Sequence, residues 1–332
     1  MEKEAKMVSR RRLMMFLGFL PLTLALPGCE WLADKPVSIG AYVWPGYEPI
    51  FLARNQGWLD AQQVRLVETT STTDSLKALT EGRVDGAALT LDEVLKARAS
   101  GLPLSVVMIF DISAGADMVV ARPGIKNLAD LKGRRIGIEQ GAVSELMLTE
   151  SLRAAGLTKE EVTLVELPVD QQSDAWANNQ LDAAVTYEPV ASKLLGQGAR
   201  KLFDSRQIPN LIVDVLAIRN DVLDRSHARA IRHLIAAHFH ALNHLTRNPQ
   251  DTAYRMAPRL GLPAAHVLSV FKGLMLPDAA ENYRLLAGTS PELLPGARKL
   301  SAAMVKNGLL KQDDPLTALI RADFLPTDFQ QN

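Results

Sequence analysis

Short apolar runs alternate with longer stretches of helical character through the first part of the chain. The expected strands cover 37–43, 64–68 and 86–90, and the expected helices cover 48–59, 74–81 and 91–99. Strands that alternate with helices form a parallel sheet with helices on its faces. The pattern therefore predicts an α/β unit that begins near residue 37.

The same order of elements returns about 97 residues later. The matching pairs of segments are 39–40 and 136–137, 64–68 and 162–166, and 84–88 and 181–185. Three matches in one order and at nearly one spacing indicate an internal duplication. We therefore expect a second α/β unit built like the first.

Two long apolar segments, 104–111 and 211–218, flank the second copy, and the first of them is followed by a turn at 113–116. Beyond Arg219 the chain is mostly helical. The clearest expected helix, 226–245, carries one apolar stripe, and further helices are expected at 264–272 and 291–307. The stripe consists of Ile231, Leu234, Ile235, Phe239, Leu242 and Leu245.

These elements predict two α/β lobes joined by a two-strand hinge, with the C-terminal helices on the first lobe. We place lobe 1 at 37–116 and 217–332, and lobe 2 at 117–216. Ligands of open α/β sheets bind outside the carboxyl ends of the parallel strands. A ligand site is therefore expected between the lobes.

The first residues have the pattern of an export signal. Three arginines at 10–12 precede the apolar run 13–26, which is shorter than the ~20 residues of a membrane-spanning helix. The run ends at Leu26-Pro27-Gly28-Cys29, which resembles a bacterial lipobox with an unusual proline. We expect 1–28 to be a lipoprotein signal peptide, Cys29 to be lipidated and 29–36 to form a tether. The arginines also resemble a twin-arginine signal, which is the alternative export route.

Composition excludes several classes of protein. The chain has 37 Lys and Arg against 37 Asp and Glu, and without 1–28 the balance is 32 against 35, so a nucleic-acid partner is not expected. One cysteine cannot form an intramolecular disulfide, a structural zinc site or an iron–sulfur cluster. All six histidines lie between 227 and 266, where we interpret them as a solvated helix face and not as a metal site. We expect no cofactor and no metal.

Three motifs carry a family resemblance. They are WPGYEP at 44–49, NLADLKGRRIG at 127–137 and DAAVTYEP at 182–189. The chain resembles periplasmic solute-binding proteins of ABC importers in the nitrate, sulfonate, taurine and thiamine-pyrimidine-precursor (NMT1-like) group. The resemblance implies a type II periplasmic-binding-protein clamshell and a small ligand held at the hinge. It also implies delivery to an ABC permease and its ATPase on the periplasmic side of a bacterial membrane.

Candidate ligand contacts follow from the places where strands end and helices begin. In the first lobe they are Trp44, Tyr47, Glu48, Thr72, Thr73, Thr90 and Asp92. In the second lobe they are Glu139, Gly141, Ser144, Tyr187 and Glu188, and near the crossings they are Asp111, Ser113 and Asp214. Thr73, Asp92 and Glu188 are also good helix caps, so capping is the alternative role for each of them.

These candidates offer many hydrogen-bond acceptors and no arginine, which favours an amine, a zwitterion or a nitrogen heterocycle over nitrate. We predict a monomeric, lipid-anchored binding component that captures a small organic nitrogen or sulfur compound, of the sulfonate/taurine or aminopyrimidine type. The alternatives are nitrate-type anion binding, a cofactor-precursor enzyme on the same fold, or a sensory or structural lipoprotein. No motif of a hydrolase or a nucleotide-binding enzyme is present, so catalysis is not expected.

Overall fold

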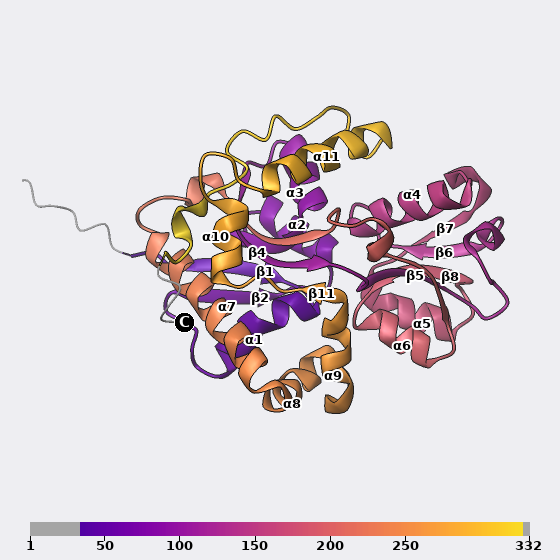
Figure 1. Ribbon diagram of the computed structural model, residues 1–332, viewed down its shortest axis with the longest axis horizontal. Coiled ribbons are helices and arrows are strands. Elements are labelled where there is room, and N and C mark those ends of the chain that lie inside the picture. The colour runs from indigo at the N-terminus through magenta and orange to yellow at the C-terminus, as the bar shows by residue number, and fades with distance from the viewer. Residues whose placement is uncertain (1–33, 328–332) are drawn as a thin grey trace, which may run out of the picture. The chain divides into compact units, whose positions relative to one another are not determined.

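The computed structural model describes residues 34–327, so Cys29 and the expected signal peptide lie outside the described residues. The described residues contain a six-stranded sheet of order β11-β4-β10-β3-β1-β2 and a five-stranded sheet of order β7-β6-β8-β5-β9 (Figure 1). No helix among residues 34–327 is long and apolar enough to span a bilayer.

The six-stranded sheet is assembled from both ends of the sequence. Its strands are β1 (Val37–Ala41), β2 (Val64–Glu68), β3 (Gly86–Thr90), β4 (Leu104–Ser113), β10 (Val213–Arg219) and β11 (Leu274–Met275). Its first helices are α1 (Glu48–Asn55), α2 (Thr72–Thr80) and α3 (Leu91–Ala99), with α2 and α3 on one face and α1 on the other (Figure 1). Strands β1 and β3 are buried along their whole length, as expected for central strands covered on both faces.

The five-stranded sheet is formed by one continuous segment. Its strands are β5 (Asp117–Ala121), β6 (Arg135–Ile138), β7 (Thr163–Glu166), β8 (Ala183–Tyr187) and β9 (Arg200–Asp204). Helix α4 (Val143–Ala155) covers one face, and α5 (Gln172–Ala177) and α6 (Val190–Gly196) cover the other (Figure 1).

The register of the strands confirms the duplication. In the first sheet Ile39 pairs with Leu66 and Gly86, and in the second Ile136 pairs with Leu164 and Ala183. These are the partners that the repeat spacings of 97 and 98 residues require. The side chain of an aspartate fastens each copy: Asp85 accepts a bond from the backbone N–H of Ser38, and Asp182 accepts one from that of Arg135.

Within the described residues, five α-helices follow the second sheet. They are α7 (Ala228–Arg247), α8 (Pro249–Leu260), α9 (Ala264–Val270), α10 (Ala279–Leu286) and α11 (Leu293–Lys306). Helix α7 packs on α1 and α11 packs on α3, so the C-terminal helices add to the six-stranded sheet, as expected (Figure 1). The predicted apolar stripe of α7 is buried. Helices α8 and α10 were not predicted as separate elements; Pro258 lies in the last turn of α8, where it ends the helix together with Gly261.

Two chain crossings join the sheets, between β4 and β5 and between β9 and β10. The hydroxyl groups of Ser113 and Ser205 are 2.8 Å apart, so the crossings contact each other directly. Gly273 packs against the first crossing so closely that a Cβ there would lie 2.7 Å from the backbone nitrogen of Ala116. All of β10 pairs within the six-stranded sheet, including residues 213–216.

Candidate functional site

A small cavity, closed too tightly in this arrangement to hold a water molecule, is lined by residues of both sheets. Tyr42 and Trp44 follow β1, while Thr90 ends β3. From the second sheet, Asp117 begins β5 and Tyr187 ends β8. The remaining lining residues are Val143, at the start of α4, and Asp214, near the start of β10. The lining therefore lies where the parallel strands end, as predicted, and it draws on both copies of the repeat.

Aromatic rings form much of the wall. The ring of Tyr187 lies 5.6 Å from Trp44 and 5.8 Å from Tyr42, and these contacts bridge the two sheets. Tyr47 lies behind them, with its ring centroid 5.3 Å from that of Tyr42. Edge-to-face contacts at these distances are favourable, so the rings hold one another in place.

Trp44 is fixed by two neighbours. Its indole N–H donates a 2.9 Å hydrogen bond to Asp111, and the backbone of Gly46 lies against the same pair. A Cβ at Gly46 would lie 1.7 Å from a carboxylate oxygen of Asp111. Only glycine allows this close approach, which explains the Trp-Pro-Gly-Tyr sequence at the end of β1.

Asp111 and Asp214 are register partners on the antiparallel strands β4 and β10. The hydroxyl of Tyr47 donates a 2.5 Å hydrogen bond to Asp214. Burial is the main reason why the pKa of Asp111 is raised to about 8; hydrogen bonds to Trp44 and Asp214 oppose the rise, and the charge of Asp117 adds to it. Burial also raises the pKa of Asp214 well above its ordinary value, and Asp111 adds to that effect.

Asp117 completes a group of three buried aspartates. Burial raises the pKa of its carboxyl group to about 7, against a lowering contribution from Ser113. One carboxylate oxygen on each of Asp111, Asp117 and Asp214 has no hydrogen-bond partner within the described protein. On folding, these three oxygens lose their hydrogen bonds to water and gain none from the protein. This loss costs free energy unless a proton or a ligand satisfies the oxygens.

Thr90, Asp92 and Glu93 sit where α3 begins. The hydroxyl of Thr90 donates to Asp92, and the backbone N–H of Thr90 donates to Glu93. The other oxygen of Glu93 accepts a 3.0 Å bond from the backbone N–H of Val143, the first residue of α4. One carboxylate therefore caps two helices that belong to different sheets.

Two further contacts join the sheets at this edge. The backbone N–H and the hydroxyl of Thr73 donate to one oxygen of Glu139, at 3.1 and 2.8 Å. Lys96 forms a 2.6 Å ion pair with Glu145. Both predicted residues, Thr73 and Glu139, thus contact each other across the two sheets.

The structure places other predicted residues away from the cavity lining. Glu48 forms a buried ion pair with Arg259 of α8, and the guanidinium group of Arg259 lies 3.3 Å from the ring centroid of Phe51. Glu188 caps α6 by accepting bonds from the backbone N–H and hydroxyl of Ser192. Ser113 bonds to the second crossing, as described above.

Three further predicted residues do not line this cavity. Thr72 and Ser144 are buried at the starts of α2 and α4. Gly141, with φ of 83°, makes the left-handed turn that leads into α4.

Sequence reasoning missed Tyr42, Asp117 and Glu93. Tyr42 directly follows β1, which is the signal that identified Trp44, and Asp117 lies beside the first crossing, which is the kind of signal that identified Asp214. In the sequence Glu93 is recognisable only as the third residue of α3. Its bond to Val143 joins residues 50 positions apart, so no local sequence pattern predicts it.

The histidines differ from the expected solvated face in one case. His238 is fully buried beside Phe110, and burial lowers its pKa to about 3. His240 and His244 pack on the ring of Trp58, and neither of these two histidines is fully buried. Among residues 34–327, no group of three or more His, Cys, Asp or Glu side chains is arranged to hold a metal ion.

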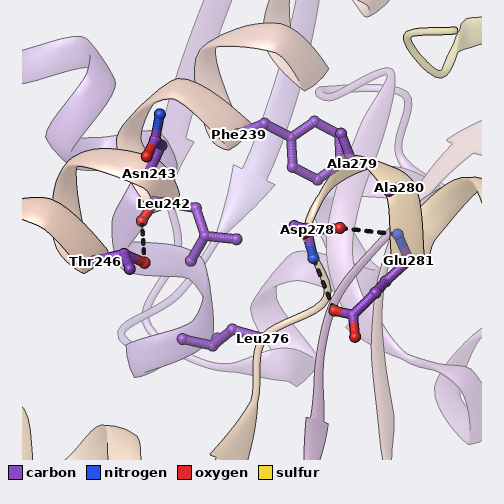
Figure 2. Close-up of a pocket in the computed structure, with 9 residues that line it drawn as sticks. All are labelled: Phe239, Leu242, Asn243, Thr246, Leu276, Asp278, Ala279, Ala280 and Glu281. Carbon is purple, nitrogen blue, oxygen red and sulfur yellow. Dashed lines mark hydrogen bonds between the residues drawn. The ribbon is translucent and has the colours of Figure 1, made fainter. Parts of the chain in front are cut away.

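A second pocket, of about 360 Å³, lies between α7 and the beginning of α10 (Figure 2). Its two acids are already bonded within a turn, since Asp278 and Glu281 form a capping box, and the hydroxyl of Thr246 donates to the carbonyl of Leu242. In contrast to the cavity between the sheets, neither acid of this pocket has a buried oxygen without a partner.

Solved structures share this fold. The alkanesulfonate-binding protein SsuA from Xanthomonas axonopodis pv. citri, bound to MOPS, superposes with a TM-score of 0.70 at 20% identity, covering 84% of this chain and 95% of that one. The desulfurization enzyme DSZB superposes with a TM-score of 0.63 at 17% identity, covering 87% and 97%. The fold is therefore that of periplasmic binding proteins, as predicted, and an enzyme shares it.

Residues 44–252 match the family model described as NMT1/THI5 like, and the chain belongs to that family. The taurine-binding periplasmic protein of Escherichia coli is 23% identical over 209 residues, which are 60% of this chain and 64% of that protein. A Brucella abortus protein, provisionally named as a binding protein, is 26% identical over 145 residues, 41% of this chain and 44% of that protein. The chain thus spans about half the length of the curated relatives it matches.

Proposed function

We propose that this protein is the solute-binding component of an ABC importer and captures a small organic solute between its two sheets. The observation that carries the proposal is the cavity lined by the strand ends of both sheets. A solute held there contacts both sides at once, so its binding stabilises the closed arrangement of the two lobes. The lobes would be 37–116 with 217–332, and 117–216, with residues 213–216 strand-paired to the first.

The export signal and the similar proteins support a periplasmic location. A lipid on Cys29 would tether the protein to the membrane beside an ABC permease and its ATPase. Taurine-binding and alkanesulfonate-binding proteins are among the relatives and structural neighbours. They favour the importer over a sensory or structural lipoprotein.

The wall of the cavity favours a solute with nitrogen donors. Tyr42, Trp44 and Tyr187 offer aromatic rings, and Asp117 and Asp214 offer acceptor oxygens. Such a wall suits an amine or an aminopyrimidine, and it suits the ammonium group of a taurine-type zwitterion. A bare anion such as nitrate is disfavoured because no Lys or Arg lines this cavity.

Binding without catalysis is favoured over the enzyme alternative. The relatives and neighbours named as binding proteins carry this preference, because the acids and tyrosines of the lining could themselves serve as bases. The fold itself does not decide the question, since DSZB shares it.

A thermal-shift screen of the chain without 1–28 tests the proposal. The solutes are taurine, alkanesulfonates, nitrate and aminopyrimidines, and a solute at ~100 times its Kd adds about 2.7 kcal/mol of stability. Trp44→Ala should abolish the shift, whereas the matched control Trp58→Ala, which alters a ring outside the cavity, should retain it. Recovery of the bound solute unchanged supports binding, and turnover of that solute contradicts it.

A further inference from the structure

We propose that the solute is a small organic cation with N–H donors, of the ammonium or amidinium type, held by Asp117 and Asp214 and packed on the rings of Trp44 and Tyr187. This inference rests on the proposed function, because it assigns the solute of the same cavity. Among the solutes considered under the proposed function, it favours those that carry a positive charge.

The buried aspartates supply the first step. Asp117 and Asp214 are 3% and 1% exposed, both line the cavity, and each has one carboxylate oxygen without a partner in the described protein. Thr186, the neighbour of Tyr187, adds a buried hydroxyl that is also unpartnered. Acceptors that are buried and unpaired call for donors, and ammonium and amidinium groups consist of little else.

The second step is the absence of positive charge from the cavity wall. The lining residues include two acids and no Lys, Arg or His. The charged and titratable groups that influence the three aspartates are Asp92, Glu93, Glu188, Tyr47 and the aspartates themselves. Where these acids are ionised they repel a negative charge and attract a positive one, and a cation placed among them lowers their pKa and so favours the ionised form.

The aromatic wall supplies the third step. Tyr42, Trp44 and Tyr187 surround the same small space, and ring faces attract cations through the quadrupole of their π-electrons. Since no group of acids in residues 34–327 is arranged for a metal ion, an organic cation fits this combination better than a metal does. In the closed arrangement the cavity has no room for such a cation, so the lobes must part to admit it.

Proton exchange follows from the same geometry. Burial favours the protonated form of these acids, so a bound cation must displace protons as it pairs with the carboxylates. An anion such as a sulfonate would need protonated acids as donors, and its binding would take up protons. The direction of proton exchange therefore separates the two kinds of solute.

The experiment uses probes that share a shape and differ in charge. The cations are benzamidine and methylguanidinium, the neutral counterparts are benzamide and methylurea, and the anions are benzenesulfonate and methanesulfonate. Each is measured by calorimetry at pH 7.5 in two buffers of different ionisation enthalpy. We expect a cation to bind at least about tenfold more tightly than its neutral counterpart, with proton release.

Variants locate the effect. Asp214→Asn and Asp117→Asn should each weaken binding of the cation roughly 10- to 100-fold, because a hydrogen bond to a charged group is lost. Asp251→Asn, an exposed acid of α8, should leave the affinity unchanged and serves as the matched control. Circular dichroism melts of all three variants verify that each is folded.

The outcomes distinguish the two proposals. Sulfonates that bind in the Trp44-dependent cavity with proton uptake overturn the cation inference and leave the importer function intact. Neutral probes that bind as well as the cations also overturn it. Cation binding that survives both aspartate variants places the charge recognition elsewhere and overturns it too. Failure of every probe in this panel and in the thermal-shift screen contradicts the proposed function itself.

Discussion

Two groups of buried acids in this protein have opposite surroundings. Glu48 is buried at the start of α1, but Arg259 pairs with it and also contacts Phe51 and Glu68. Asp111, Asp117 and Asp214 are buried to the same degree, yet they are surrounded by aromatic rings and other acids.

The difference separates an acid that serves the fold from acids available to a ligand. Burial raises the pKa of Glu48 to about 7 even though Arg259 lowers it, so this carboxyl group also carries a burial cost. The protein itself supplies the counter-charge at Glu48 and supplies none at the three aspartates. Burial alone is therefore a poor guide to function, and the identity of the partner is the better one.

Removing the counter-charge of Glu48 should have the largest effect. Arg259→Ala leaves Glu48 buried without its partner and removes the cation over Phe51, so we expect a loss of about 3–5 kcal/mol in the free energy of unfolding. Urea denaturation measures it. The double variant Glu48→Gln/Arg259→Ala should lose less than Arg259→Ala alone, because no charge is then stranded. An equal loss in both would mean that the arginine acts by packing only.

The pH dependence of stability should follow the unpaired aspartates. Their pKa values are raised in the folded protein, to about 8 for Asp111 and about 7 for Asp117, so the folded state binds more protons than the unfolded state between roughly pH 4 and 8. Stability should therefore fall as the pH rises through this range, by several degrees in Tm. Thermal melts at pH 5, 6.5 and 8 measure this slope.

Asp117→Asn should flatten this slope, because it removes one of the groups that takes up a proton on folding. Asp60→Asn changes an exposed acid and is the control. A wild-type Tm that stays constant, or rises, from pH 5 to pH 8 would contradict the assignment of these acids as buried and unpaired.

A smaller effect is expected at the turn that holds Trp44. Gly46→Ala places a methyl group against Asp111, and the forced shift should cost about 1–3 kcal/mol of stability. It should also weaken solute binding, because the Trp44–Asp111 bond must move. Gly124→Ala is the matched control, since nothing lies within 4 Å of a Cβ there. Equal effects at the two glycines would argue against the close approach.

The smallest effect concerns the ion pair between the sheets. Lys96→Met removes the partner of Glu145 at a partly exposed position, so we expect a loss below about 1 kcal/mol. The same change should favour the separated arrangement, which small-angle scattering measures as a larger radius of gyration. Lys132→Met is the control, since its partner Glu161 belongs to the same lobe. A scattering curve that changes equally in both variants would contradict a role for Lys96 in closure.

Much of the fold could be predicted because it repeats. The spacing between Ile39 and Ile136 fixed both the number of sheets and the register of their central strands. Trp44 was predicted in the site because it follows a strand end, and Asp214 because it lies near a crossing between the lobes.

The partners of the acids could not be predicted in the same way. Arg259 lies 211 positions from Glu48 and Val143 lies 50 positions from Glu93, and only the packing of separate elements brings them together. Glu188 illustrates the opposite case: its capping partner is four residues away, and the sequence had offered capping as one of its two roles.

Because Glu93 caps helices of both lobes, hydrogen exchange at the amide of Val143 should measure how often the lobes separate. The N–H of Val143 begins α4 and bonds to a residue of the other lobe. If the lobes separate, this proton loses its acceptor and becomes free to exchange with deuterium, while amides deeper in α4 stay protected by their own helix. The exchange rate at this single position would therefore report the fraction of open molecules, without a dye, a spin label or knowledge of the solute.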